Sequence, residues 1–293
     1  MRIRASALAA VGTTIVIALA GCGSSGSSSK KTGGSSDPGA AVVRAADVTG
    51  SSSGYRFQAT INLTGTATPL KASMTGTILR SSNRGEIVLA ESVLGHALHI
   101  SERYSGRTYW VSAAGIPDAT KLTSKPWLEY NVGSTLNQLG LGGLPSGSSN
   151  PTQFLTYLKA VGAGAQKLGT QTIRGVATTH YAVAVDLDKY VQLVPAANRA
   201  AARKTIQLLI STLGSSTLHM QVWIDSHDLT RQLYLSFPEC VAQQHLHVGL
   251  TMDLFDFGTK AAIALPTAAQ SYNITSLVNQ QLATQKLGCA ATS

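Results

Sequence analysis

The sequence predicts an α+β protein: a strongly curved antiparallel sheet, a half-barrel of about ten strands, with helices packed on its concave face. Two observations lead to this fold class. Stretches in which apolar and polar residues alternate recur along most of the 293-residue chain, as half-buried antiparallel strands require. Two amphipathic helical patterns interrupt these stretches in the middle of the chain. A parallel sheet would require strands and helices to alternate one by one, and this pattern is not seen.

Strands are expected wherever the alternation is bounded by Gly, Ser or another turn residue. The first is clear, because Tyr55, Phe57 and Ala59 alternate with polar residues. The expected strands cover 55–63, 70–78, 86–90, 96–101, 107–112, 171–173, 178–185, 218–224, 233–237 and 246–257.

Four segments follow a helical period instead. The pattern at 40–48 begins after Asp37-Pro38, which suits a helix entry. Asn150-Pro151 suits an N-cap followed by proline at the first helical position, and it predicts a helix that runs to Val161. Further helices are expected at 195–213 and 274–285.

The first residues carry the marks of an export signal. Two arginines precede the apolar stretch 5–20, which is shorter than the roughly 20 residues that a spanning helix needs. Residues 19–22, Leu-Ala-Gly-Cys, fit the bacterial lipobox, in which a peptidase cuts before a cysteine that has received a diacylglyceryl group. We therefore expect residues 1–21 to be a lipoprotein signal peptide and Cys22 to be lipidated, with acyl chains such as palmitate. The alternative is an uncleaved N-terminal anchor in which Cys22 is incidental.

Residues 22–38 are expected to join the lipidated cysteine to the rest of the chain as a flexible tether, since a Ser/Gly/Lys-rich segment cannot bury apolar surface. Such a segment reaches about 20–24 Å. Residues 39–293 are expected to form a single domain. Because two or more acyl chains hold a protein stably on a membrane, we expect this domain on the outer, extracytoplasmic face of the cell membrane.

Charged residues are scarce, at 13% of the chain, against about 25% in a typical soluble domain. Without the signal peptide, 21 basic and 14 acidic residues remain, a net charge of +7. This balance favours an anionic membrane or envelope surface, although a generally basic exported surface explains it equally well. Nucleic acid is not an expected partner of an exported chain.

Two cysteines remain besides Cys22, and we expect Cys240 and Cys289 to form a disulfide, because an isolated pair in an oxidising compartment is more often bridged than free. Closing this loop of about 49 residues would stabilise the fold by roughly 4 kcal/mol in the chain-entropy account.

The sequence lacks the motifs of common active sites: H-E-x-x-H, C-x-x-C, G-x-S-x-G and G-x-x-x-x-G-K-[ST]. His245 and His247 project on the same side of an expected strand, but spacing ties no third ligand to them, so a polar outer face is favoured over a metal site. Asp186 and Asp188 could be a pair of acids, yet they stand at a strand end. We expect no catalytic residue, no metal and no cofactor, and therefore no enzyme.

The apolar faces of the two central helices are candidates for the lining of a cavity for apolar ligands. A curved sheet around amphipathic helices either packs solidly or encloses a cavity, and periodicity does not separate the two. Ordinary core is thus the open alternative for these residues. The candidates are Phe154, Leu155, Leu158, Val161, Ile206, Leu209, Ile210 and Leu213.

Three motifs resemble a known family. The stretch 175–186, Gly-Val-Ala-Thr-Thr-His-Tyr continuing to Asp186, is similar to the "G-V-x-T-x-H-Y … D" strand of actinobacterial LppX/LprA/LprF/LprG-type lipoproteins. Val-Trp-Ile-Asp at 222–225, followed by 229–233, resembles their "V-W-[IV]-D-x-x-x-L-x-R" hairpin. Tyr109-Trp110 and Pro126-Trp127 fit their "Y … W" stretch, whereas 237–240 and the C-terminal cysteine depart from the family.

The resemblance implies a LolA-like half-barrel whose helices and concave face hold acyl chains. It implies structural roles for the motif residues: a turn at Gly175, aromatic packing at Tyr181 and Trp223, and a hairpin at Asp225. Members of this family are understood to bind lipids or lipidated glycans and to move them through the envelope.

We therefore expect a membrane-anchored cell-envelope lipoprotein that binds acylated lipid or glycolipid in a hydrophobic cavity and carries or presents it. Envelope transport proteins are its candidate partners. The alternative function is that of a non-catalytic envelope scaffold or sensor that binds a protein partner.

Overall fold

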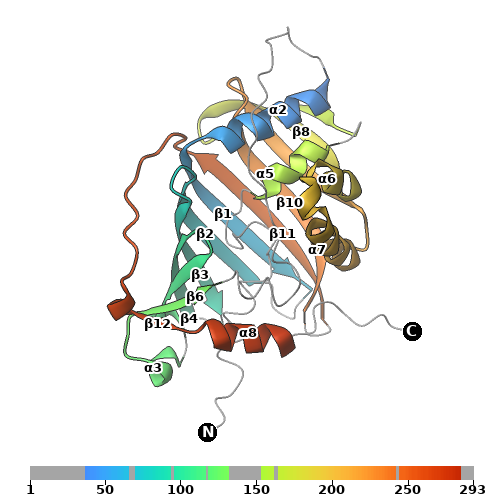
Figure 1. Cartoon of the computed structure of the whole chain (residues 1–293). Helices are drawn as coiled ribbons and strands as arrows, with labels where there is room; N and C mark the ends of the chain where they lie inside the picture. The colour runs from blue at the N-terminus through green and yellow to red at the C-terminus, as the bar shows by residue number, and fades with distance from the viewer. Residues whose placement is uncertain are drawn as a thin grey trace, which may run out of the picture.

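The computed structural model describes residues 37–65, 70–93, 96–116, 118–131, 153–161, 164–241 and 244–284. These residues form one sheet of 12 strands in the order β12-β6-β5-β4-β3-β2-β1-β11-β10-β9-β8-β7. The sheet is open and curves around a concave face, with helices against that face (Figure 1). The α+β fold class with a curved, largely antiparallel sheet is confirmed.

The strands correspond closely to the alternating stretches of the sequence. Two strands were not expected: β6 has five residues and β12 three, too short for an alternating pattern to stand out, and β12 pairs with β6 in parallel. The strands are β1 Gly54–Thr64, β2 Leu70–Leu79, β3 Arg84–Val93, β4 His96–Ser105, β5 Thr108–Ser112, β6 Trp127–Asn131, β7 Gln166–Ile173, β8 Val176–Asp186, β9 Thr217–Asp225, β10 Thr230–Val241, β11 Gln244–Phe255 and β12 Ser271–Asn273.

The helices occupy three places. Figure 1 shows α2, α5, α6 and α7 in front of the concave face and the short α3 at the lower left, near β12. Helix α8 lies below the concave face and runs from β12 toward the lower ends of β10 and β11. Among the described residues, no helix combines the length and the apolar character needed to cross a membrane. The helices are α2 Pro38–Ser51, α3 Ala119–Leu122, α5 Gln153–Tyr157, α6 Leu187–Leu193, α7 Arg199–Leu213 and α8 Thr275–Thr284.

Helix α2 begins as the sequence predicts. The Asp37 carboxylate accepts a hydrogen bond from the Gly39 N–H at 2.9 Å, and Pro38 occupies the first helical turn. The helix then runs to Ser51 and buries Val42, Ala45 and Ala46 in the core. It is longer than the expected 40–48 and takes up Pro38, the last residue assigned to the tether.

The middle helices differ from the expectation. The helix expected to run to Val161 is only five residues long, since α5 tightens into a 3-10 turn at Leu158–Ala160 and Val161 then bridges to Val185 of β8. Its expected cap, Asn150-Pro151, lies outside the described residues. Helix α6 was not expected, because the alternation of β8 runs directly into it.

Asp186 is the N-cap of α6, and its carboxylate accepts a hydrogen bond from the Lys189 N–H at 2.9 Å. A capping role therefore accounts for this acid. Helix α7 follows a 3-10 turn at Ala196–Asn198 and ends at Gly214, which adopts the left-handed conformation that glycine permits (φ 67°).

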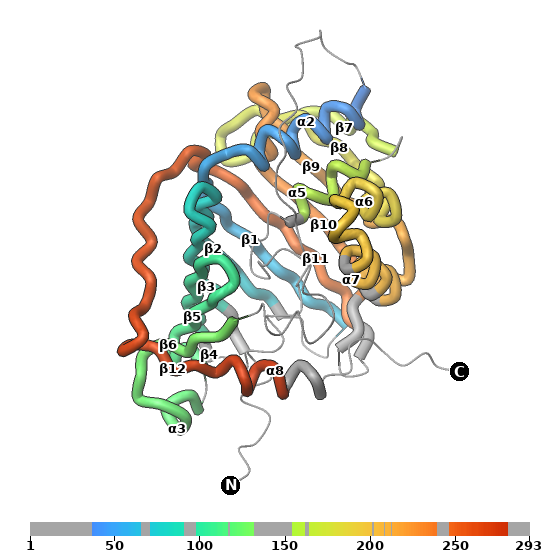
Figure 2. The backbone as a smooth tube through the Cα atoms, viewed as in Figure 1, coloured from blue at the N-terminus to red at the C-terminus, as the bar shows by residue number. Residues whose placement is uncertain are grey.

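An extended return segment, residues 256–270, connects β11 to β12 along the left side of the molecule (Figure 2). Arginines from the convex side of the sheet hold it: Arg103 Nη1 donates to the Ala264 carbonyl at 3.0 Å and Arg84 Nη1 to the Ile263 carbonyl at 3.5 Å. Lys125 Nζ donates to the Ser271 carbonyl at 2.7 Å. These bonds place β12 beside β6 and so position α8.

Candidate functional site

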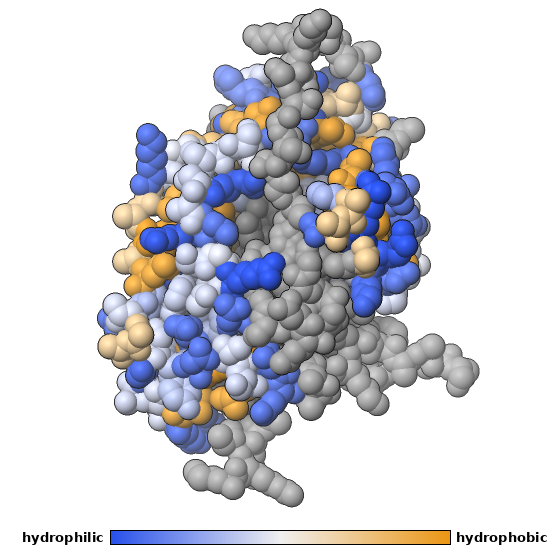
Figure 3. Space-filling model, viewed as in Figure 1, coloured by the Kyte–Doolittle hydropathy of each residue, from blue (hydrophilic) through white to orange (hydrophobic). Residues whose placement is uncertain are grey.

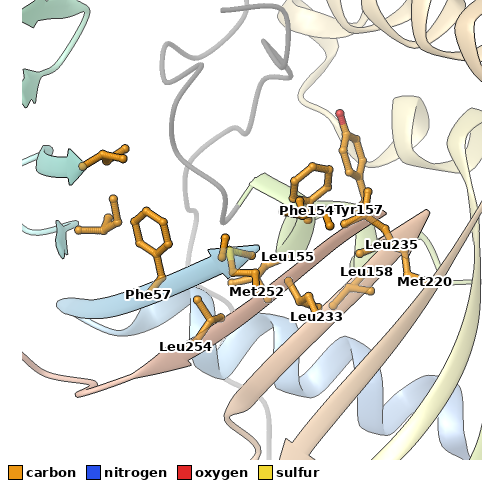
Figure 4. Close-up of a cluster of buried hydrophobic side chains, with 14 of the residues drawn as sticks. Phe57, Phe154, Leu155, Tyr157, Leu158, Met220, Leu233, Leu235, Met252 and Leu254 are labelled. Carbon is orange, nitrogen blue, oxygen red and sulfur yellow. The ribbon is translucent and has the colours of Figure 1, made fainter. Parts of the chain in front are cut away.

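The concave face carries a continuous apolar surface built by strand pairing. Because side chains of a strand alternate between faces, residues in register across the sheet form rows on one face. One row joins Leu233, Met252 and Ala59, and the next joins Leu235, Leu250 and Ile61. Figure 4 shows strand residues of this surface beneath the side chains of α5 and its 3-10 turn.

At the end of the sheet where β1 begins, beside α2, this surface is closed to solvent. We call it the sealed end. Tyr55, Phe57 and Ala59 of β1 are at most 1% exposed, and the apolar residues of α2 share the same core. The β9–β10 turn is fixed to α2 at this end: Arg44 Nε lies 2.8 Å from Asp228 Oδ2, and the Thr230 N–H donates to Thr49 Oγ1 at 2.8 Å.

Farther along β1, Ile61 and Leu63 are half-buried, although their β11 partners Leu250 and Val248 are 5% and 3% exposed; we call this region the half-exposed end. Helix α7 ends there, because β9 follows it directly in the chain. Strand β9 begins at the end of the sheet that lies opposite the β9–β10 turn. The residues of the half-exposed end are Ile61 and Leu63 of β1, Ala72 of β2, Leu98 of β4, Phe237 of β10, and Leu209, Ile210 and Leu213 of α7. In Figure 3, most residues along the rim of the concave side are hydrophilic, and hydrophobic residues lie among them near α2 and α8.

The structure divides the eight cavity candidates between the two regions. Phe154, Leu155, Leu158, Val161 and Ile206 are buried, with 5% exposure or less, and Leu158 is fully buried. Leu209, Ile210 and Leu213 are half-buried and pack against the core. The candidates thus belong to one contiguous apolar cluster, but only the three on the second half of α7 retain accessible surface.

The concave face also carries polar groups that sequence reasoning missed. Tyr104, Tyr109 and Tyr130 stack in one row across β4, β5 and β6, with ring centroids 5.5 and 5.4 Å apart. Tyr130 Oη donates a hydrogen bond to Glu102 Oε2 at 3.3 Å. The alternation of β4 places Glu102 on the same face as Ile100 and Tyr104, so the sequence did hold a signal for it.

The pKa of Tyr130 is raised well above its ordinary value, first by burial and then by the negative charge of Glu102. Burial likewise raises the pKa of Tyr104. These phenols therefore stay protonated at physiological pH, and Tyr130 acts as the donor to Glu102.

The family-like motif residues have the structural roles that the resemblance implies. Gly175 makes the β7–β8 turn with a φ of 80°. Trp223 stacks on His180 at 4.1 Å and donates from Nε1 to Gln171 Oε1 at 2.8 Å, and Tyr181 packs against the core from the concave side.

Asp225 accepts hydrogen bonds from the N–H groups of His227 and Leu229 and from Arg231 Nε, the last at 2.6 Å. Burial alone would raise the pKa of Asp225, but these three bonds outweigh it and hold the pKa below its ordinary value. The Asp225 carboxylate is thus held in its charged form, and its hydrogen bonds fix the β9–β10 turn.

Among the described residues, no three His, Cys, Asp or Glu side chains are grouped to hold a metal ion. His247 pairs with Ser236 Oγ at 2.5 Å, and His180 Nε2 lies 2.8 Å from Gln221 Oε1. His245 lies opposite Cys240 in the β10–β11 register. Cys289 and residues 1–36, which include Cys22 and the expected signal peptide and most of the expected tether, lie outside the described residues.

No protein-family model and no curated protein sequence matches the chain. Solved structures do match it. LprF from Mycobacterium bovis has 13% identity and a TM-score of 0.43, over 80% of this chain and 99% of that chain. The lipoprotein LppX from Mycobacterium tuberculosis has 11% identity and a TM-score of 0.43, over 78% and 98%. A LolA-superfamily protein from Nitrosomonas europaea has 8% identity and a TM-score of 0.29, over 78% and 96%.

LprF and LppX, two lipoproteins of the type that the sequence motifs resemble, are thus among the matched structures. At identities of 13% or less and TM-scores of 0.43 or less, these matches say nothing about ligand or activity.

Proposed function

We propose that this protein is a membrane-tethered lipid-binding protein of the cell envelope that holds acylated lipid or glycolipid against its concave face and carries or presents it. One observation carries the proposal: the apolar concave face continues beyond the sealed end into a region where several of its side chains, on β1, β10 and α7, are only half-buried. An acyl chain laid on this region would complete its burial.

The energetics favour such a ligand. Each buried methylene contributes about 0.8 kcal/mol, so part of one acyl chain suffices to offset the cost of association. Leu209, Ile210 and Leu213 would touch the chain directly. Phe154, Leu155, Leu158, Val161 and Ile206 would form the buried wall behind it. No catalytic step is part of this proposal.

The anchor belongs to the same proposal. Cys22 would carry the acyl groups that hold the protein to the outer face of the cell membrane, and residues 23–36 would allow the domain to move about 20 Å from the anchor. A Cys22→Ala variant should carry no acyl groups and should keep residues 1–21, because the peptidase cuts only before a lipidated cysteine; mass spectrometry of the purified proteins would show both changes. Removal of residues 1–21 from the variant at the same position would contradict lipidation at Cys22.

Mass spectrometry of organic extracts tests lipid binding itself. The full chain with Cys22→Ser, purified without detergent, should release a lipid in near-stoichiometric amount. Repeated absence of lipid, together with no uptake of added lipid, would refute the carrier function. If such a preparation instead retained one stoichiometric protein partner, the alternative function of scaffold or sensor would take its place.

A further inference from the structure

Helix α7 carries positive charge that the protein does not neutralise. It contains three basic residues, Arg199, Arg203 and Lys204, and no acid. The nearest acids in the sequence, Asp186 and Asp188, stand at the start of α6, where Asp186 is the N-cap. Seven ion pairs join Lys or Arg to Asp or Glu among the described residues, and none of them involves α7.

The three cations differ in their surroundings. Arg199 closes the connection between α6 and α7, because its Nε donates to the Val194 carbonyl at 2.9 Å and its Nη2 to the Gln192 carbonyl at 3.1 Å. Arg203 and Lys204 are exposed, and within the part of the chain that the structure describes neither side chain has a hydrogen bond or an ion pair. Both charges therefore face the solvent.

An exposed apolar side chain lies beside this charge. Leu193 is 52% exposed, more than any other large apolar side chain among the described residues. Arg199 binds the carbonyls of both its neighbours, Gln192 and Val194. In Figure 3, strongly hydrophilic residues with hydrophobic ones among them lie on the side of the molecule where Figure 1 places α6 and α7. Cations around an apolar side chain suit the interface of an anionic bilayer, where the side chain enters the headgroup region and the cations meet phosphates.

The same side of α7 leads to the half-exposed end. Ile210 follows Arg203 by seven residues, or two helical turns, and so faces nearly the same direction about 10 Å farther along the axis. Ile210 is half-buried and belongs to the half-exposed end. A flat surface that contacts Arg203 would therefore lie close to that end.

We infer that Arg199, Arg203 and Lys204, together with Leu193, form a docking surface for a bilayer that contains anionic phospholipid. Docking there brings the half-exposed end to the membrane that supplies or receives an acyl chain. The inference goes beyond the proposed function, because a protein that holds no lipid could dock in the same way. A membrane is favoured over an acidic protein because the cations are combined with a single exposed leucine rather than with a contiguous apolar patch.

Vesicle binding tests the inference without the lipid anchor. Residues 22–293 with Cys22→Ser, which include every described residue, are mixed with vesicles of dioleoylphosphatidylcholine, alone or with an equal amount of dioleoylphosphatidylglycerol. Bound protein is measured by co-sedimentation at about 0.1 M salt, where charges act over about 10 Å. We expect binding to the anionic vesicles, little binding to the neutral ones, and weaker binding as the salt concentration rises.

The decisive variant is Arg203→Gln with Lys204→Gln. It should weaken binding to anionic vesicles by roughly twenty-fold, since each cation near an anionic surface contributes about five-fold. Arg80→Gln with Lys260→Gln is the matched control. It removes the same net charge at two exposed residues, in the β2–β3 turn and in the return segment, and should change binding by less than about three-fold.

Leu193→Ser provides a second, independent variant. It should weaken binding about five-fold by a factor that does not change with salt, because the contribution of an apolar side chain is not screened. Circular dichroism confirms that each variant is folded. Equal losses in the two double variants, or no binding of the parent protein to anionic vesicles, would overturn the inference, and the latter would favour an acidic protein as the partner.

Lipid content separates this inference from the proposed function. Docking affects the exchange of lipid with a membrane and not the affinity of the concave face, so both double variants should retain as much lipid after purification as the parent protein. Loss of docking with unchanged lipid content would count against the docking surface alone. Absence of lipid from a parent protein that still docks would count against the carrier function alone.

Discussion

The sealed end and the half-exposed end of the concave face are built from the same strands with the same alternation, yet they differ in burial. Phe57 and Ala59 of β1 are 1% exposed, whereas Ile61 and Leu63, the next two residues on that face, are half-buried. The first part of β1 therefore belongs to the core and its second part keeps apolar surface accessible, whereas the β11 partners of that second part, Leu250 and Val248, stay buried.

Side-chain interactions also hold the sealed end together. Asp225 bonds within the β9–β10 turn, and Arg44 and Thr49 tie that turn to α2. The ring centroids of Tyr55 and Phe257 lie 6.0 Å apart. Stability should thus be concentrated at the sealed end and ligand binding at the half-exposed end. Substitutions in the two regions are expected to separate these properties.

The largest effect is expected at Asp225, whose side chain is 1% exposed and pairs with Arg231. Asp225→Ala leaves the Arg231 guanidinium and two N–H groups without their acceptor and should lower the free energy of unfolding by about 3–5 kcal/mol in chemical denaturation. Asp256→Asn is the control, because Asp256 pairs with Arg56 where both side chains are 54% exposed, and it should cost less than about 1 kcal/mol. Similar losses in the two variants would contradict the role of the buried turn.

Asp225 also predicts a pH dependence. Its pKa is lower in the folded than in the unfolded protein, so the unfolded state binds the proton first as the pH falls. Its stabilisation is complete above the unfolded pKa of about 4 and is lost as the pH falls through the folded pKa. Denaturation midpoints of Asp225→Ala should accordingly fall less steeply below pH 4 than those of the parent protein. Parallel curves would show that Asp225 does not titrate in this way.

Leu158 should come next, because it is fully buried at the 3-10 turn after α5. Leu158→Ala should destabilise the fold by about 2–5 kcal/mol, since it removes apolar contacts and leaves a cavity. Leu209→Ala, on the half-buried part of α7, should cost less than half as much. Urea denaturation of both variants measures the difference, and equal losses would show that the two helices are buried alike.

The proposed Cys240–Cys289 disulfide would act at the far end of β10. Figure 1 shows α8 leading from β12 in the direction of β10 and β11, and Cys289 follows α8 by a few residues. Oxidised protein should resist alkylation until it is reduced, and Cys289→Ser should lower the free energy of unfolding by roughly 2–4 kcal/mol. Alkylation of both thiols in protein purified under oxidising conditions would exclude the bridge.

Much of the fold could be predicted because it is local. The alternation of Tyr55, Phe57 and Ala59 defines a strand, and Asp37-Pro38 defines a helix start, whatever the rest of the chain does. Strand β12 could not be predicted, because it has only three residues and pairs with β6 across about 140 residues of sequence. Strand β6, which also pairs with β5, has only five residues. Helix α6 escaped notice because the β8 pattern leads straight into it.

The candidate site was only partly predictable for a related reason. Helical periodicity identified two apolar faces, one containing Leu158 and the other Leu209, but burial depends on what packs above each residue, which is not a local property. For Glu102, the alternation of β4 does indicate the face on which it lies. Its neighbours, Ile87 and Val111 in register and Tyr130 through a hydrogen bond, emerge only from the structure.

The most direct test of lipid binding at the half-exposed end is the lipid-to-protein ratio of an α7 variant pair. Leu209→Asp places a charge on the proposed ligand-contacting surface, and Gln207→Asp places the same charge on the exposed side of the same helix. Both variants should keep the circular dichroism spectrum of the parent protein. We predict that Leu209→Asp loses most of its bound lipid and that Gln207→Asp keeps it. Equal lipid content in the two folded variants would contradict the assignment of ligand binding to this end.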